Sequence, residues 1–138
     1  MGIGLLLSRD LFFISKVTGT AAACGRTVLA GANLADLLAR AGESTVSLLL
    51  LDLAQQDLDP AQALLEWEQS GRPRPHRLAF GSHVHTAALQ AARDAGCDDV
   101  FPRSKFSAQL PEILQQFLSP PQQQPTGTEL PPSETGSA

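Results

Sequence analysis

The sequence predicts an α/β domain built on a parallel five-stranded sheet, and three observations support this prediction. The stretch VSLLLLDL at residues 46–53 is an uninterrupted apolar run of strand length, which is typical of a strand covered on both faces. Short apolar runs alternate five times with segments of helical periodicity. Glycine, proline and helix-capping residues separate these segments. We therefore expect a flavodoxin-like (βα)5 fold with helices on both faces and strand order 2-1-3-4-5.

Capping signals define most of the predicted boundaries. Asp10, Asn33 and Asp59 are suitable N-cap residues, and Asp59 is followed by the favourable first-turn residue Pro60. The loop at residues 102–105 precedes a last helix that we expect to begin at Pro111. The predicted strands are residues 3–7, 27–30, 46–53, 78–80 and 98–101, and the predicted helices are residues 11–24, 34–40, 60–70, 86–95 and 111–118.

The chain of 138 residues is long enough for one hydrophobic core, which we assign to residues 1–118. Residues 119–138 are rich in proline, glutamine, serine and threonine and nearly free of large apolar groups. Such a segment cannot bury enough surface to offset the entropy of ordering it. We therefore predict a disordered tail after a single domain.

Composition excludes several classes of function. The net charge is −4 and no basic run occurs, which argues against nucleic-acid binding. No stretch approaches the roughly 20 apolar residues of a membrane span, and the first residues lack the basic flank of a signal peptide. Cys24 and Cys97 stand far apart without a metal-binding spacing, and we interpret them as structural thiols. We expect a cytoplasmic protein.

Asp52 is the candidate functional residue because it ends the leucine-rich central strand. In parallel α/β sheets, functional groups lie at the carboxyl ends of the strands. Aspartate is also common in turns, so a purely structural role in the following loop is an equally good interpretation of this residue alone.

Three features together resemble a known family. They are the apolar strand ending in Asp52, the acid Asp59 in the following loop where the family often has Asp-Gly, and the segment AARDAGCDD at residues 91–99. The last is similar to the A-x-x-A-G-A-x-D block before the family's final strand. Over residues 3–118 the chain thus resembles the receiver domain of two-component response regulators, the CheY-like superfamily.

The resemblance implies a phosphorylation site from which several parts are missing. In the family, the aspartate corresponding to Asp52 accepts a phosphoryl group from a histidine kinase. Two acids after the first strand hold Mg²⁺, which neutralises charge on the transferring group. Ser8 and Arg9 stand at those positions, and Asp10 follows where it caps the next helix. We therefore expect no cofactor and no working Mg²⁺ site. Asp10 and Asp52 are the weak candidates for ligands if a metal ion does bind.

Two further family positions differ. The residue corresponding to the family's hydroxyl after the fourth strand is Gly81, with Ser82 one residue later. The residue corresponding to the family's lysine after the fifth strand is Arg103, with Lys105 two residues later. The resemblance thus implies that the phosphoryl-binding hydroxyl is displaced by one residue and that an arginine stands in place of the lysine.

We therefore expect a degenerate receiver. Arg9 and Arg103, with Lys105 as a third candidate, should converge on Asp52 and keep its carboxylate paired without a phosphoryl group. Such a chain is expected to be a stand-alone signalling module and not an enzyme. By the resemblance, its partner protein would bind the face of the fourth helix, fifth strand and fifth helix, at residues 87–90 and 100–106.

Two alternatives remain open. Asp52 could be a phosphoacceptor in a phosphorelay served by a histidine kinase, with Asp10 as a lone ligand for Mg²⁺. The chain could instead be a flavodoxin-like domain that binds an anion or another small ligand between Arg9 and Arg103.

Other candidate sites find less support. His83 and His85 form an H-x-H pair without a third metal ligand, so solvated loop histidines are the favoured interpretation. A hydrolase built from Ser82, His83 and Asp52 lacks the G-x-S-x-G turn, and no glycine-rich phosphate loop follows the first strand. Trp67 is expected to be half exposed while packing against the sheet, with a role at a protein interface as the less favoured alternative.

Overall fold

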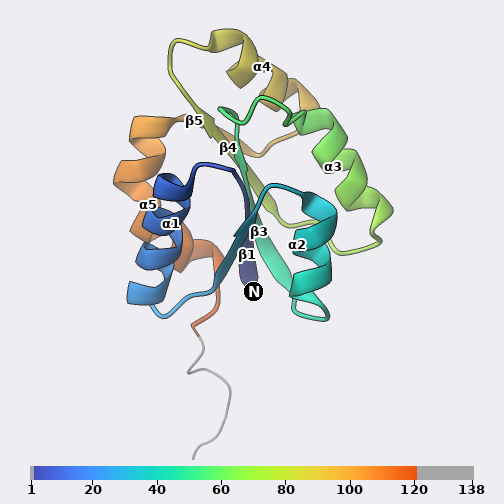
Figure 1. Cartoon of the computed structure of the whole chain (residues 1–138), viewed down its shortest axis with the longest axis vertical. Coiled ribbons are helices and arrows are strands. Elements are labelled where there is room, and N and C mark those ends of the chain that lie inside the picture. The colour runs from blue at the N-terminus through green and yellow to red at the C-terminus, as the bar shows by residue number, and fades with distance from the viewer. Residues whose placement is uncertain (1, 121–138) are drawn as a thin grey trace, which may run out of the picture.

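A computed structural model describes residues 2–120 of the chain, and it consists of strands and helices in strict alternation (Figure 1). The predicted tail falls at residues 121–138, which lie outside the described residues. No described helix has both the length and the apolar character needed to cross a membrane. The elements are β1 (Ile3–Leu7), α1 (Leu11–Ala23), β2 (Val28–Gly31), α2 (Leu34–Ala41), β3 (Val46–Asp52), α3 (Pro60–Gln69), β4 (His76–Gly81), α4 (Thr86–Ala95), β5 (Asp99–Pro102) and α5 (Arg103–Phe117).

All five strands are parallel and pair in the order β2-β1-β3-β4-β5, which confirms the predicted fold and topology. The central strand β3 pairs with β1 through Leu5↔Leu49 and with β4 through Asp52↔Phe80. From β1, the chain adds β2 on one side and then adds β3, β4 and β5 on the other side. The carboxyl ends of β1 and β3 therefore form the switch point of the sheet, where open α/β sheets place their ligands.

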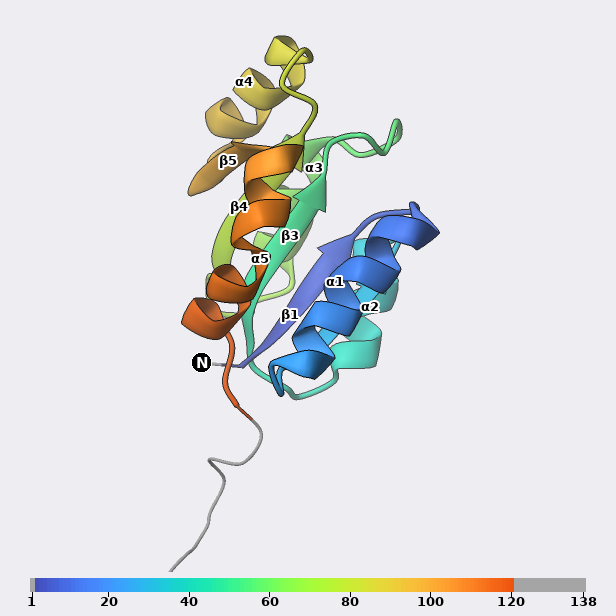
Figure 2. The ribbon, with the colours of Figure 1, turned by 90° about the vertical axis from the view of Figure 1, so that its left-hand side faces the viewer.

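The leucines of the central strands are buried because both faces of the sheet are covered. Leu48 and Leu50 face the core shared with α1 and α5, whereas Leu49 and Leu51 face the core shared with α2, α3 and α4. Figure 2 shows α1 and α5 together in front of the strands. This alternation explains why the apolar run of β3 has no polar interruption.

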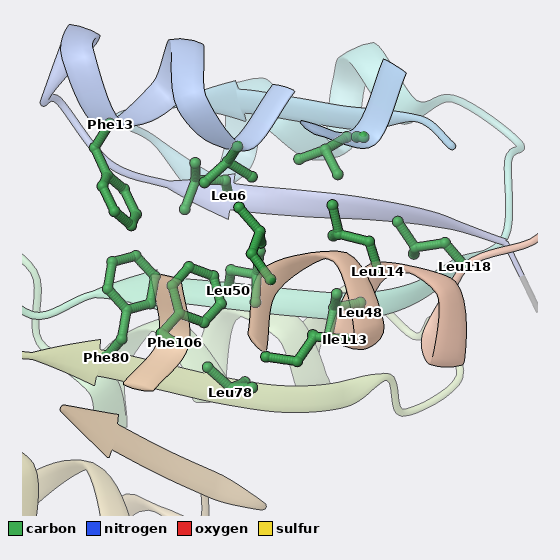
Figure 3. Close-up of a cluster of buried hydrophobic side chains, with 14 residues drawn as sticks. Leu6, Phe13, Leu48, Leu50, Leu78, Phe80, Phe106, Ile113, Leu114 and Leu118 are labelled. Atoms are coloured by element: carbon green, nitrogen blue, oxygen red, sulfur yellow. The ribbon is translucent and has the colours of Figure 1, made fainter. Parts of the chain in front are cut away.

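Three aromatic rings fill the end of the α1/α5 core that lies near the carboxyl edge of the sheet (Figure 3). Phe80 of β4 stacks on Phe106 of α5, with ring centroids 4.3 Å apart and planes 2° from parallel. Phe13 of α1 lies 5.0 Å from Phe80 and 5.9 Å from Phe106. This aromatic cluster joins both helices to the strand that neighbours β3.

Helix starts follow the predicted caps, with one exception. Asp10, Asn33 and Asp59 each accept a hydrogen bond from a backbone N–H of the first turn of α1, α2 and α3, respectively. The prediction that the last helix begins at Pro111 is wrong, because α5 begins at Arg103 and contains Pro111 in its interior. Pro111 is exposed, so its ring faces away from the core and its position costs the helix a backbone bond but no packing.

Two other expectations need correction. The fourth strand begins at His76 and not at residue 78, because His76 and Arg77 pair in register with Leu48 and Leu49. Trp67 is only 2% exposed, not half exposed. Its indole Nε1 donates a hydrogen bond to the Pro73 carbonyl at 3.2 Å, which satisfies the polar atom of the buried ring.

Candidate functional site

Asp52 is the last residue of β3 and lies at the carboxyl edge of the sheet. Its neighbour in register is Phe80 of β4, and only 1% of Asp52 is exposed. The strand continues past this point through one further bond, from Leu53 N–H to the Phe80 carbonyl at 2.9 Å. A carboxylate at this depth is stable only with hydrogen-bond partners or an opposite charge.

Both carboxylate oxygens of Asp52 have such partners. The Ser8 hydroxyl donates to Oδ2 at 2.7 Å. Arg103 Nη2 donates to Oδ1 at 2.9 Å, and the Ala54 backbone N–H donates to the same oxygen at 3.0 Å. We call Asp52, Ser8 and Arg103 the Asp52 cluster. Its hydrogen bonds join the loops after β1 and β3 to the start of α5.

Arg103 is held in position by the aromatic cluster. It is the first residue of α5, so its side chain begins close to the carboxyl edge of β5. Its guanidinium carbon lies 4.6 Å from the centre of the Phe13 ring and 5.5 Å from that of Phe80. The planar guanidinium group can stack on rings while donating along its edge, which a lysine ammonium cannot do in the same way.

Ser8 and Asp10 organise the loop after β1. Ser8 is 1% exposed, and its oxygen accepts a hydrogen bond from the Asp10 backbone N–H at 3.2 Å while its hydroxyl donates to Asp52. Asp10 does not contact Asp52 through its side chain; its Oδ1 accepts from the Phe13 N–H at 3.2 Å and caps α1. The cap interpretation of Asp10 therefore holds.

Two of the three predicted cations are not at Asp52. Arg9 forms an exposed ion pair with Asp57, with Nη2 and Oδ2 2.8 Å apart, because Ser8 and Arg9 are consecutive residues and Ser8 is the one that points inward. Lys105 places its Nζ 4.3 Å from the centre of the Phe101 ring. The expectation that Arg9 and Lys105 converge on Asp52 is wrong, whereas Arg103 does reach it.

The residues after β4 contribute no hydrogen bond to the Asp52 cluster in the described structure. Gly81 ends β4, and a Cβ atom at this position would lie 3.1 Å from the Leu53 Cβ, so the site there is narrow. The Ser82 hydroxyl oxygen accepts from the Val84 N–H at 3.4 Å. His83 and His85 are exposed loop residues. Ser82, His83 and Asp52 therefore form no catalytic arrangement.

The donor set at Asp52 does not fit the Mg²⁺ ion that the family resemblance implies. Mg²⁺ requires an octahedral set of oxygens, supplied by carboxylates and water. Here the buried carboxylate faces a hydroxyl and a guanidinium group, and the latter would repel a dication. Across residues 2–120, no three His, Cys, Asp or Glu side chains are grouped so that they could hold a metal ion.

Sequence reasoning missed a second polar cluster, at the amino ends of β4 and β5. His76 Nε2 lies 2.7 Å from Asp99 Oδ2, and the His76 ring stacks on Phe117 with centroids 4.0 Å apart. Arg74 Nη2 lies 2.6 Å from Asp98 Oδ1. Parallel pairing of β4 with β5 brings these residues together, and no local sequence motif predicts the cluster.

The two cysteines are free and partly buried. Burial raises the pKa of the Cys97 thiol to about 11, so it is protonated at neutral pH and a poor nucleophile. This agrees with a structural role for Cys97.

No family model and no curated protein sequence matches the chain. Solved structures do match. A LuxR family DNA-binding response regulator from Silicibacter pomeroyi superposes with a TM-score of 0.60 over 96% of this chain and 98% of that one, at 18% sequence identity. FixJ-N superposes with a TM-score of 0.62 over 86% of this chain and 98% of that one, at 15% identity.

The chain has the fold of response-regulator receiver domains. At this level of identity the likeness concerns the fold alone. The chemistry of the site depends on the residues that this chain places there. In this receiver fold, the carboxylate at the end of β3 is paired with Ser8 and Arg103.

Proposed function

We propose that this protein is a signalling module that acts by binding a partner protein and does not depend on phosphorylation of Asp52. The observation that carries the proposal is the 2.9 Å contact between Arg103 and Asp52. Arg103 and Ser8 engage both carboxylate oxygens, so the loops around Asp52 are already tied together. An ion pair in that place makes the carboxylate a weaker nucleophile. We propose no enzymatic role.

The proposed partner surface is the face formed by α4, β5 and α5. Within residues 87–90 and 100–106, Leu89 and Phe106 are buried and cannot contact a partner. Ala87, Gln90 and Lys105 are exposed. Half-buried Phe101 supplies an aromatic ring of the kind that is enriched at interfaces. The exposed Lys105 places its Nζ 4.3 Å from the centre of that ring and adds a positive charge to the face.

Incubation with phosphoramidate and Mg²⁺, followed by intact mass measurement, tests the proposal. We expect no phosphate adduct on the unmodified chain. Asp52→Asn is the matched control, because it removes the candidate acceptor and keeps the side-chain shape. An adduct that forms on the unmodified chain and disappears in Asp52→Asn would contradict the proposal and support a phosphorelay with a histidine kinase.

A second variant tests whether the missing acids and the missing lysine explain the expected absence of phosphorylation. The triple variant Ser8→Asp/Arg9→Asp/Arg103→Lys supplies the acids and the lysine that the family resemblance assigns to these positions. We expect this variant to accept phosphate in the presence of Mg²⁺ and to lose that ability when Asp52→Asn is added. Circular dichroism checks that each variant is folded.

The partner surface needs its own test. Once a partner has been identified by affinity capture and its binding measured with purified proteins, we expect Lys105→Glu to weaken binding by about tenfold. Lys16→Glu, an equal charge change on exposed α1, is the control and should leave binding unchanged. Equal weakening by both variants would place the interface elsewhere.

A further inference from the structure

A cavity of about 210 Å³ opens at the carboxyl edge of the sheet, on the face covered by α2 and α3. Leu7 at the end of β1 and Gln55 in the loop after β3 both line it, so it lies at the switch point of the sheet. Figure 1 shows the loops after β1, β2 and β3 gathered above the ends of the strands. Open α/β sheets bind ligands at this place. We call it the Gln55 cavity.

Gln55 is the unusual residue of this cavity, because it is a polar side chain only 8% exposed. Its Nε2 donates to the Ala32 carbonyl at 3.2 Å and to Asp57 Oδ1 at 3.0 Å, and both partners also line the cavity. Its Oε1 is buried and has no hydrogen-bond partner among residues 2–120. An unsatisfied buried carbonyl is unfavourable, so a ligand that donates a hydrogen bond to Oε1 would gain stability from that contact.

The charges of the lining decide which kind of donor fits. Arg9 and Asp57 neutralise each other across 2.8 Å. The hydrogen bond from Gln55 and, to a smaller extent, the Arg9 guanidinium hold the pKa of Asp57 below its ordinary value, so it stays ionised. Asp59 and Glu66 then remain as carboxylates without a paired cation in the lining. The cavity is therefore negatively charged overall and favours a cation over an anion.

We propose that the Gln55 cavity binds a small organic cation whose primary ammonium or guanidinium group donates a hydrogen bond to Gln55 Oε1. The acids Asp59 and Glu66 supply the balancing charge. The volume is below the roughly 300–1,000 Å³ of drug-sized sites, so the ligand is small. The group could belong to a free amine or to a lysine or arginine side chain of another protein, because the recognised chemistry is the same.

Calorimetric titration of the full chain with putrescine, a four-carbon diamine, tests this proposal. Butane-1,4-diol has the same length without the charge and is expected to bind at least about tenfold more weakly. Nα-acetyl-lysine N-methylamide presents the ammonium group as a protein would. Comparable affinity for this compound points to a protein side chain as the source, and binding of putrescine alone points to a free amine; either result supports a cation site.

Two variants on one helix locate the binding. Glu66→Gln removes a lining charge from α3 and should weaken putrescine binding about fivefold. Glu68→Gln removes an exposed charge two residues away that does not line the cavity, and it should have no effect. Gln55→Met, which deletes Oε1 at similar volume, should abolish putrescine binding. If this variant does not fold, the comparison of Glu66→Gln with Glu68→Gln still tests the proposal.

Three results would overturn the proposal. They are no binding of either amine at millimolar concentration, equal binding of the diol, or equal weakening by Glu66→Gln and Glu68→Gln. The last would indicate attraction to surface charge in general. Putrescine binding should also be unchanged in Asp52→Asn, so failure of the phosphorylation-independent mechanism and failure of this cation site can be told apart.

Discussion

The Asp52 cluster and the Gln55 cavity both border the loop after β3, but they differ in whether their buried polar atoms have hydrogen-bond partners. The carboxylate of Asp52 has a partner on each oxygen, including a guanidinium group fixed by two aromatic rings. The amide of Gln55 is satisfied on its nitrogen and unsatisfied on its oxygen. One loop thus borders a closed polar cluster on the side of α1 and α5 and an open site on the side of α2 and α3.

The difference shows what determines whether a polar site is open. Asp52 lies where long and aromatic side chains of α1 and α5 meet above the sheet, so the space is filled. Gln55 lies between the first turns of α2 and α3, where the cavity remains. A closed cluster of satisfied polar groups stabilises the fold, whereas an open cavity leaves space that a ligand could occupy.

The largest expected effect concerns the aromatic rings that close the Asp52 side. Phe13→Ala removes a ring that is 5% exposed, and we expect a loss of about 3–5 kcal/mol in the free energy of unfolding. Phe12→Ala is the matched control, because this neighbouring ring is 84% exposed and its loss should cost less than about 0.5 kcal/mol. Urea unfolding measures both, and similar losses would contradict the closed packing.

Substitution of one arginine at each site compares the Asp52 cluster with the Gln55 cavity directly. Arg103→Met leaves the buried carboxylate of Asp52 without its cation, and we expect a loss of about 3 kcal/mol. Arg9→Met breaks the exposed pair with Asp57 and should cost less than about 1 kcal/mol. Adding Asp52→Asn to Arg103→Met should restore part of the stability; strict additivity in this double-mutant cycle would show that the two residues do not interact.

Two serines give a smaller comparison. Ser8→Ala removes a buried donor to a carboxylate at 2.7 Å, and we expect a loss of about 1.5–3 kcal/mol in the free energy of unfolding. Ser82→Ala removes a hydroxyl that only accepts a 3.4 Å bond from a loop amide, and it should be nearly neutral. Thermal unfolding of the two variants side by side distinguishes them.

The polar cluster at the amino edge of the sheet predicts a modest pH dependence. Burial raises the pKa of Asp98, but bonds from Arg74 and from the Arg77 backbone N–H outweigh it, so this pKa is lowered overall. A lowered carboxyl pKa contributes stability above the unfolded value of about 4, and this contribution is lost as pH falls through the folded value.

Asp98→Asn should therefore make the loss of stability between pH 6 and pH 3 shallower. Asp94→Asn, an exposed carboxylate on α4, is the control. Urea midpoints at the two pH values measure the difference. An unchanged slope in Asp98→Asn would show that this carboxylate has no part in the acid response.

Much of the fold was predictable because its signals are local. The caps Asp10, Asn33 and Asp59 mark the starts of α1, α2 and α3, and the unbroken leucines of β3 indicate a strand covered on both faces. The start of α5 was missed because Pro111 was interpreted as a first-turn residue. The two turns before it are held by contacts of Arg103 and Phe106 with the rest of the molecule, which the sequence alone does not show.

The site was less predictable than the fold. The spacing behind the family resemblance located Arg103 near Asp52, but the direction of a loop side chain depends on its neighbours, so Arg9 and Lys105 were misplaced. Ser8 was considered mainly as a missing acid, although its hydroxyl is a direct partner of Asp52. Gln55 stood in an ordinary polar loop, and only its burial identifies it.

The parallel bridge between Gly2 and Leu118 has a practical consequence. The first and last parts of the described chain meet at the amino edge of the sheet, where the Ser119 N–H also donates to the Gly2 carbonyl. Asp52 and Gln55 lie at the other edge, about 20 Å away along the seven residues of β3. Attachment to a surface at Gly2 or directly after Pro120 should therefore orient both sites toward solution in surface-based binding measurements.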